Sequence, residues 1–179
     1  MTSQSQNSGS GTISRDSRRL LKRKPRIRQL QDSDWRWLWA AYEMGAWREL
    51  IDSDLPRQAF RERMFEIVGS VPYDWIIEAR GTDGLRPVGL ILAKDWASGR
   101  GIEPHIDWFP WATPRNKFEG ATAFLREVGK RLKIVVYTDD ASEKFYLRLI
   151  RYRILRKGCR ILDYYARGEH SLMFYTVGP

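Results

Sequence analysis

The sequence predicts an α+β fold, a mixed β-sheet with helices on both of its faces. Strand and helix patterns follow one another along the chain in the order β-α-α-β-β-β-α-β-α-β-β. Two strand segments, 88–93 and 134–137, are almost continuously apolar, as expected where both faces of a sheet are covered. A chain of 179 residues with 42% hydrophobic residues is also long enough for one domain with a sizeable core.

Composition divides the chain into two regions. Residues 1–14 are mostly Ser, Gln, Asn, Gly and Thr, which is typical of disorder. Residues 1–28 contain eight basic residues and one acidic residue, and so carry +7 of the total charge of +9. We therefore expect a basic N-terminal arm over residues 1–26 and a folded domain over residues 27–179. A run of like charge is either a solvated tail or a contact for DNA or an acidic partner. The residues that would make this contact are Arg15, Arg18, Arg19, Lys22, Arg23, Lys24, Arg26 and Arg28.

The folded domain begins with a short strand and two helices. Residues 27–30 predict the strand, and Asp32 or Ser33 can cap the helix that follows. Both predicted helices, 34–44 and 54–69, carry aromatic and aliphatic residues at three- and four-residue spacing. We interpret these stripes as core-facing.

Two hairpins are expected, one in the middle of the domain and one at its end. A Gly-rich turn at 81–84 joins the strands 74–80 and 86–94. The strands 159–166 and 170–177 form the closing hairpin.

The centre of the domain is a strand that runs directly into a helix. Alternating residues over 103–110 predict the strand. Thr113 can cap the helix, and Pro114 suits its first position because a first helical residue needs no N–H partner. Such a helix N-terminus favours an anion. A strand at 133–138 and a helix at 141–153 complete the order.

This central segment resembles the acetyl-CoA motif of the GCN5-related N-acetyltransferase (GNAT) family. In that family a Gln/Arg-x-x-Gly-x-Gly/Ala loop at a helix N-terminus holds the pyrophosphate of acetyl-CoA. Phe118 stands at the first glycine position, where a glycine would let the backbone approach the phosphates closely. The alternative is an ordinary solvated helical turn with Phe118 in the core. The residues that match the cofactor-binding loop are Arg115, Asn116, Lys117, Phe118 and Gly120. The element order is also that of the GNAT fold.

The resemblance implies a catalytic tyrosine. In GNAT enzymes the strand after the central helix leads to an Asn and, seven residues later, to a Tyr that protonates the departing CoA thiolate. Asp139 and Tyr146 stand at these two positions. A phenol with a pKa near ~10 suits this proton donation, although Tyr146 could equally be a packing residue. A general base is expected on or just before the central strand. The candidates are Glu103, His105 and Asp107, and we choose His105 as the predicted base.

Residues 103–117 and 151–158 further resemble GNAT-like proteins of tailed phages, of the internal virion protein type. This resemblance implies a structural or morphogenetic virion protein without transferase activity, which docks on other virion proteins and contacts a partner or DNA through its arm. No cofactor is expected in that case. The alternative is an active N-acyltransferase that uses acetyl-CoA on an amine.

Two structural features would distinguish these functions. An open V-shaped cleft between the central strand and its parallel neighbour would favour the enzyme. An exposed aromatic cluster would favour a protein interface, and its members would be Trp37, Trp96, Trp108 and Trp111.

Other classes of function are excluded by what the chain contains. Cys159 is the single cysteine and cannot form an internal disulfide framework. With only His105 and His170 as possible companions, no metal site is expected. No apolar run approaches the ~18 residues of a membrane helix, and the N-terminus does not have the pattern of a secretory signal. We expect a location in the virion or the host cytoplasm, with no membrane partner.

Overall fold

The computed structural model describes residues 24–48, 50–51, 54–81, 84–96, 100–138, 143–166 and 169–176. The predicted order of helices and strands is confirmed, with two short 3₁₀ helices added, η1 (Asp32–Asp34) and η2 (Val128–Lys130). The main elements are β1 (Arg26–Arg28), α2 (Trp35–Glu43), α3 (Arg57–Gly69), β2 (Tyr73–Gly81), β3 (Gly84–Trp96), β4 (Gly101–Trp108), α4 (Pro114–Glu127), β5 (Val135–Thr138), α5 (Glu143–Arg151), β6 (Leu155–Ala166) and β7 (Glu169–Thr176).

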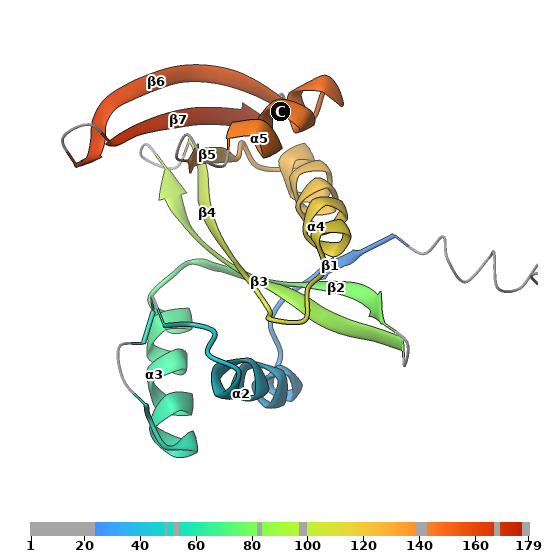
Figure 1. Ribbon diagram of the computed structural model, residues 1–179, viewed down its shortest axis with the longest axis vertical. Helices are drawn as coiled ribbons and strands as arrows, with labels where there is room; N and C mark the ends of the chain where they lie inside the picture. Colours follow the sequence, from blue (N-terminus) through green and yellow to red (C-terminus); the bar gives the residue numbers. More distant parts are fainter. Residues whose placement is uncertain are drawn as a thin grey trace, which may run out of the picture.

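The strands form two antiparallel sheets. The first has the order β1-β2-β3-β4, and the second has the order β5-β7-β6. Among the described residues, β4 meets the residue before β5 at one parallel bridge, which pairs Ile102 with Ile134. Beyond this bridge the two strands separate, so that the sheets open as a V (Figure 1). The predicted mixed sheet therefore has its parallel contact only at the apex of the V.

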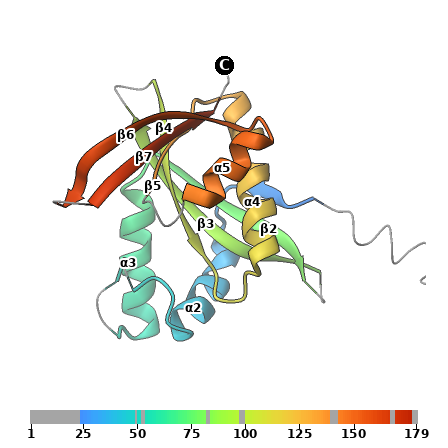
Figure 2. The same cartoon turned by 45° about the horizontal axis from the view of Figure 1, so that its top comes forward.

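Helices cover both faces of the first sheet, as predicted. Figure 2 shows α2 and α3 on one face and α4 on the other. The strand alternation explains this arrangement, because neighbouring residues of a strand point to opposite faces. Ile76 packs with Leu38 and Phe60 in the core under α2 and α3. Ile77 packs with Phe124 in the core under α4.

An ion-pair network fixes β1 against the rest of the domain. The guanidinium of Arg28 donates to both carboxylate oxygens of Asp34, over 2.6 and 2.7 Å, and to Glu78 over 2.9 Å. Asp34 is buried, with its side chain 2% exposed, and also accepts from the N–H of Gln31. Hydrogen bonding to Asp34 raises the pKa of Arg28 further above its ordinary range, so Arg28 stays charged. The N-cap residue of α2 is therefore Asp34, without a side-chain cap hydrogen bond, whereas Asp32 or Ser33 was expected to cap the helix.

The folded domain was expected to begin at residue 27, and β1 begins at Arg26. Arg26 pairs with Glu78 of β2, and Arg28 pairs with Ile76. These two residues, both among those expected to contact a partner, are thus part of the first sheet.

Candidate active site

A cavity of about 350 Å³ lies where β4 and β5 separate, and α4 and α5 form its other walls. Its apolar lining includes Ile106 and Trp108 from β4, Leu125 from α4 and Val136 from β5. The polar residues that line it are His105, Lys117, Tyr137 and Tyr146. The cavity therefore combines an apolar channel with a few polar groups, the arrangement that is typical of small-ligand sites.

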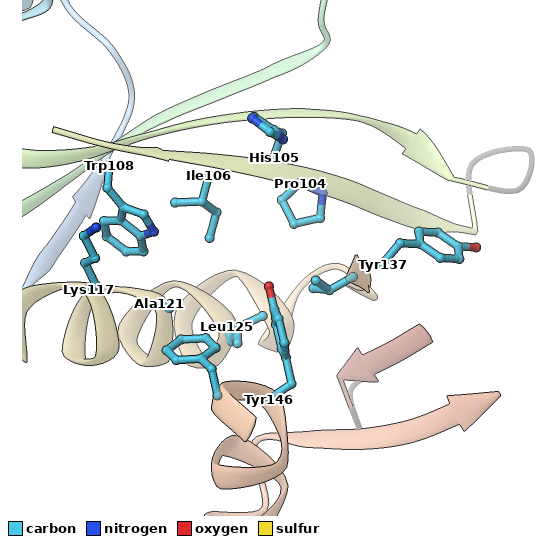
Figure 3. A pocket seen from close by; sticks show the side chains of 11 residues that line it. Pro104, His105, Ile106, Trp108, Lys117, Ala121, Leu125, Tyr137 and Tyr146 are labelled. Atoms are coloured by element: carbon cyan, nitrogen blue, oxygen red, sulfur yellow. The ribbon is translucent and has the colours of Figure 1, made fainter. Parts of the chain in front are cut away.

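The alternation of β4 decides which side chains enter the cavity. Ile106 and Trp108 point from the strand toward α4, whereas His105 points to the opposite side (Figure 3). Gly89 makes room for the Trp108 indole, and Gly120 makes room for Ile77 beside it. A Cβ at Gly89 would lie 3.0 Å from the indole ring, and one at Gly120 would lie 2.7 Å from Ile77 and 3.5 Å from the indole.

Gly120 is therefore a packing glycine. It is buried and lets α4 approach the sheet closely, because a side chain there would meet Ile77. The resemblance had assigned Gly120 to a loop around phosphates. The structure places it on the face of α4 that meets the sheet.

Tyr146 projects from α5 into the cavity, and its hydroxyl points toward β4 (Figure 3). The Tyr146 ring stacks on Phe174 with centroids 5.1 Å apart and meets the edge of Phe145 at the same distance. These contacts come from β7 and α5, which hold the phenol on a packed support. The hydroxyl is consequently positioned at the cavity wall opposite β4.

His105 lies on the other face of β4, and its side chain is 59% exposed. Its Nε2 atom is 3.2 Å from Oδ1 of Asp107. The second oxygen of Asp107, Oδ2, is buried and has no hydrogen-bond partner among the described atoms. The two predicted catalytic residues, Tyr146 and His105, therefore approach the edge of β4 from opposite faces.

Tyr137 is a cavity residue that the sequence reasoning missed. It lies in β5, and its hydroxyl accepts a hydrogen bond from Nε1 of Trp96 over 2.8 Å. The available signal was a polar group that closes the apolar run 134–137.

N–H groups in the first turn of α4 are hydrogen-bonded within that turn. Thr113 caps the helix as predicted, because its hydroxyl accepts from the N–H of Asn116 over 3.2 Å. Pro114 has no N–H, and the N–H of Lys117 donates to the carbonyl of Thr113 over 3.0 Å. The side chain of Arg115 pairs with Glu119 over 2.7 Å. The residues that match the phosphate loop thus form a regular helical turn.

Phe118 seals α4 against α5. Its ring lies 5.9 Å from Phe145 and 6.0 Å from Tyr152, both in edge-on contacts. The guanidinium of Arg148 covers the ring at 4.5 Å from its centroid. Phe118 therefore occupies the space that a glycine would leave open, and it brings a cation to the same place.

Of the basic residues assigned to the arm, Lys24 and Arg26 are exposed and Arg28 is held by Asp34 and Glu78. Asp139, which stands at the position of the family's Asn, lies outside the described residues. The arm residues that also lie outside them are Arg15, Arg18, Arg19, Lys22 and Arg23.

The four tryptophans that would mark a protein interface are all partly buried. Trp96 bonds to Tyr137, and Nε1 of Trp111 donates to the carbonyl of Pro87 over 2.7 Å. Trp37 packs edge-on against Trp111. Of the two distinguishing features, the structure shows the V-shaped opening and no exposed cluster of these tryptophans.

Within the described ranges, no three His, Cys, Asp or Glu residues gather in a way that could hold a metal ion. None of the described helices has the length and apolar content that crossing a membrane requires.

No protein-family model matches the sequence, and no curated protein sequence is similar to it. Solved structures are similar in fold. A GNAT-family acetyltransferase from Bacillus anthracis aligns with a TM-score of 0.57 and 14% identity, over 86% of this chain and 94% of that chain. A spermidine N-acetyltransferase SpeG chimera from Vibrio cholerae and hSSAT aligns with a TM-score of 0.57 and 13% identity, over 86% of this chain and 96% of that chain. The acetyltransferase yncA from Salmonella typhimurium was solved with its cofactor acetyl-CoA. It aligns with a TM-score of 0.55 and 13% identity, over 86% of this chain and 93% of that chain.

These comparisons show that the chain has the GNAT fold. They also correct the predicted function. The prediction of a phage virion structural protein is wrong, because the matched structures are acetyltransferases. The resemblance to tailed-phage proteins has no support among them, and they favour the alternative prediction, a transferase.

Proposed function

We propose that this protein is an acetyl-CoA-dependent N-acyltransferase whose active site is the cavity between β4 and β5. The observation that carries the proposal is the hydroxyl of Tyr146, which points into an apolar cavity at the opening of the V. The GNAT fold and the three acetyltransferase structures support it.

The residues present fit an acyl-CoA substrate in two different ways. The apolar lining by Ile106, Leu125 and Val136 suits an acyl group and the uncharged arm that carries it. The anionic end would need positive charge near the start of α4, and Lys117 supplies it at the cavity wall. The backbone of this turn contributes less than the family motif would, because Thr113 and Pro114 leave few of its N–H groups available.

Acetyl-CoA, when bound, supplies an acyl group activated as a thioester. Tyr146 can donate the proton that a leaving thiolate sulfur requires. The acceptor amine forms the new C–N bond as the C–S bond breaks, and it loses a proton in the process. His105, held by Asp107, is the group on the opposite face of β4 that can accept this proton.

Side chains on both faces of β4 can reach one reacting group, because β4 is the edge strand of the first sheet at this point. Past Ile102, the described residues include no strand that pairs with the outer edge of β4. A substrate carbonyl at that edge would therefore be accessible to Tyr146 from one side and to His105 from the other.

The full-length protein should transfer the acetyl group to an amine. The experiment incubates it with acetyl-CoA and a mixture of amines that includes polyamines, amino acids and a lysine peptide. Release of free CoA thiol is followed together with mass spectrometry of the amines. An acetylated amine that forms only with active protein supports the proposal. Thiol release no faster than spontaneous hydrolysis, with no acetylated amine, rejects it for the amines tested.

A further inference from the structure

The contact between Phe118 and Arg148 places a cation beside the first turns of α4. The guanidinium carbon of Arg148 lies 4.5 Å from the centroid of the Phe118 ring. The ring is itself held between α4 and α5 by Phe145 and Tyr152. Attraction between a guanidinium and an aromatic face therefore fixes the long Arg148 side chain in one place.

A stacked guanidinium keeps its hydrogen-bonding capacity. The ring contacts the face of the group, whereas the five N–H donors lie in its plane and point outward. None of the described carboxylates pairs with Arg148 or with Lys117, in contrast to Arg115, which is paired with Glu119. Two cations, Arg148 over the Phe118 ring and Lys117 at the cavity wall, are thus available to an anion.

The surroundings of Arg148 add further positive charge. A surface hollow beside α5, with a volume of about 510 Å³, is lined by Lys144, Arg148 and Arg151 together with Leu147 and Tyr152. Cations that surround a concave surface raise the local concentration of an anionic ligand. The hollow adjoins Phe118 through the contacts of Arg148 and Tyr152 with its ring.

Resting on the proposed function, we infer that Arg148, stacked on Phe118, and Lys117 hold the phosphate groups of a nucleotide thioester donor. Side chains take this role because the Thr113 cap occupies the N–H of Asn116 at the start of α4, and Phe118 stands where the family motif has a glycine. Phe118 is a platform for the cation that replaces the backbone contacts, and the substitution of glycine by phenylalanine preserves anion binding by a different means.

Calorimetric titration of the full-length protein with CoA at low ionic strength tests this inference. Arg148→Ala and Lys117→Ala should each weaken CoA binding about tenfold or more, the cost of losing a charge-assisted hydrogen bond. Arg63→Ala removes the same charge from an exposed site on α3 and should bind as the wild type does. A phosphate-free thioester, S-acetyl-N-acetylcysteamine, should bind the wild type and Arg148→Ala equally.

Phe118 gives a second, independent result. Phe118→Ala should weaken CoA binding because Arg148 loses its platform, whereas Phe118→Tyr should retain it. Tighter binding by Phe118→Ala would show that the ring only obstructs the phosphates, and would overturn the inference. Thermal melting of each variant identifies any that fail to fold. If a Phe118 variant fails to fold, the comparison of CoA binding by Arg148→Ala and Arg63→Ala decides the inference.

The outcomes separate the two proposals. If the wild type binds CoA and Arg148→Ala binds it as tightly as Arg63→Ala does, the inference fails and the proposed function stands. If the wild type binds no CoA, both fail.

Discussion

The N–H of Ile102 donates to the carbonyl oxygen of Lys133 over 2.8 Å, and this bond joins the two sheets at the apex of the V. The neighbouring residue, Gly101, makes the contact possible. A Cβ at Gly101 would lie 2.6 Å from the same carbonyl oxygen, a distance that real Cβ atoms do not tolerate. The shape of the cavity below the bridge therefore depends on close backbone approach at one glycine.

Gly101→Ala should lower the free energy of unfolding by about 1–3 kcal/mol, because the obstacle is backbone and cannot move aside cheaply. Denaturant unfolding measures this change. Gly69→Ala is the matched control, since nothing lies within 4 Å of a Cβ there. It should equal or slightly exceed the wild-type stability, as Ala favours a helix over Gly. Equal stabilities for Gly101→Ala and Gly69→Ala would contradict the described apex.

Arg28→Met should destabilise the domain by about 3 kcal/mol, because it leaves the buried carboxylate of Asp34 without its cation. Adding Asp34→Asn should recover part of this loss by removing the unpaired charge. Arg63→Met breaks an exposed pair with Glu66 and should change stability by less than about 0.5 kcal/mol. Thermal or denaturant unfolding of the four proteins tests the prediction, and a similar effect of the two arginine substitutions would refute it.

Binding of acetyl-CoA should slow amide hydrogen exchange along the free edge of β4, residues 103–108, and in α5 near Tyr146. These segments line the cavity that we propose for the acyl donor. Exchange in α3, which lies across the first sheet from α4, should change little. Protection that is confined to α2 and α3, or absent, would place the ligand elsewhere.

The sequence predicts local structure well in this chain because the signals are local. Thr113 and Pro114 define the start of α4 through a hydrogen bond and a missing N–H within one turn. Alternation over 103–110 predicted the strand β4, and in it Ile106 and Trp108 point to one face and His105 to the other (Figure 3). Each of these predictions needs only neighbours within a few residues.

Predictions that depend on distant contacts were less successful. Arg28 was expected to contact an external partner, yet its partner Glu78 lies in this domain, 50 residues away in the sequence. The Phe118 ring in α4 contacts Arg148, which lies in another helix, α5. No sequence spacing predicts this contact. The resemblance to the family motif showed only that a glycine is missing at position 118. The tertiary contacts show that the Phe118 ring packs against Arg148.

The turnover of Tyr146→Phe relative to wild type tests the central claim most directly. The variant keeps the ring that stacks on Phe174 and loses only the hydroxyl that points into the cavity. Tyr73→Phe, a phenol that stacks on Trp75 away from the cavity, is the matched control. We expect Tyr146→Phe to lower kcat for acetyl transfer by about a hundredfold or more, with CoA affinity unchanged, and Tyr73→Phe to match the wild type. Equal kcat values for Tyr146→Phe and wild type would contradict the assignment of this cavity as the acyl-transfer site.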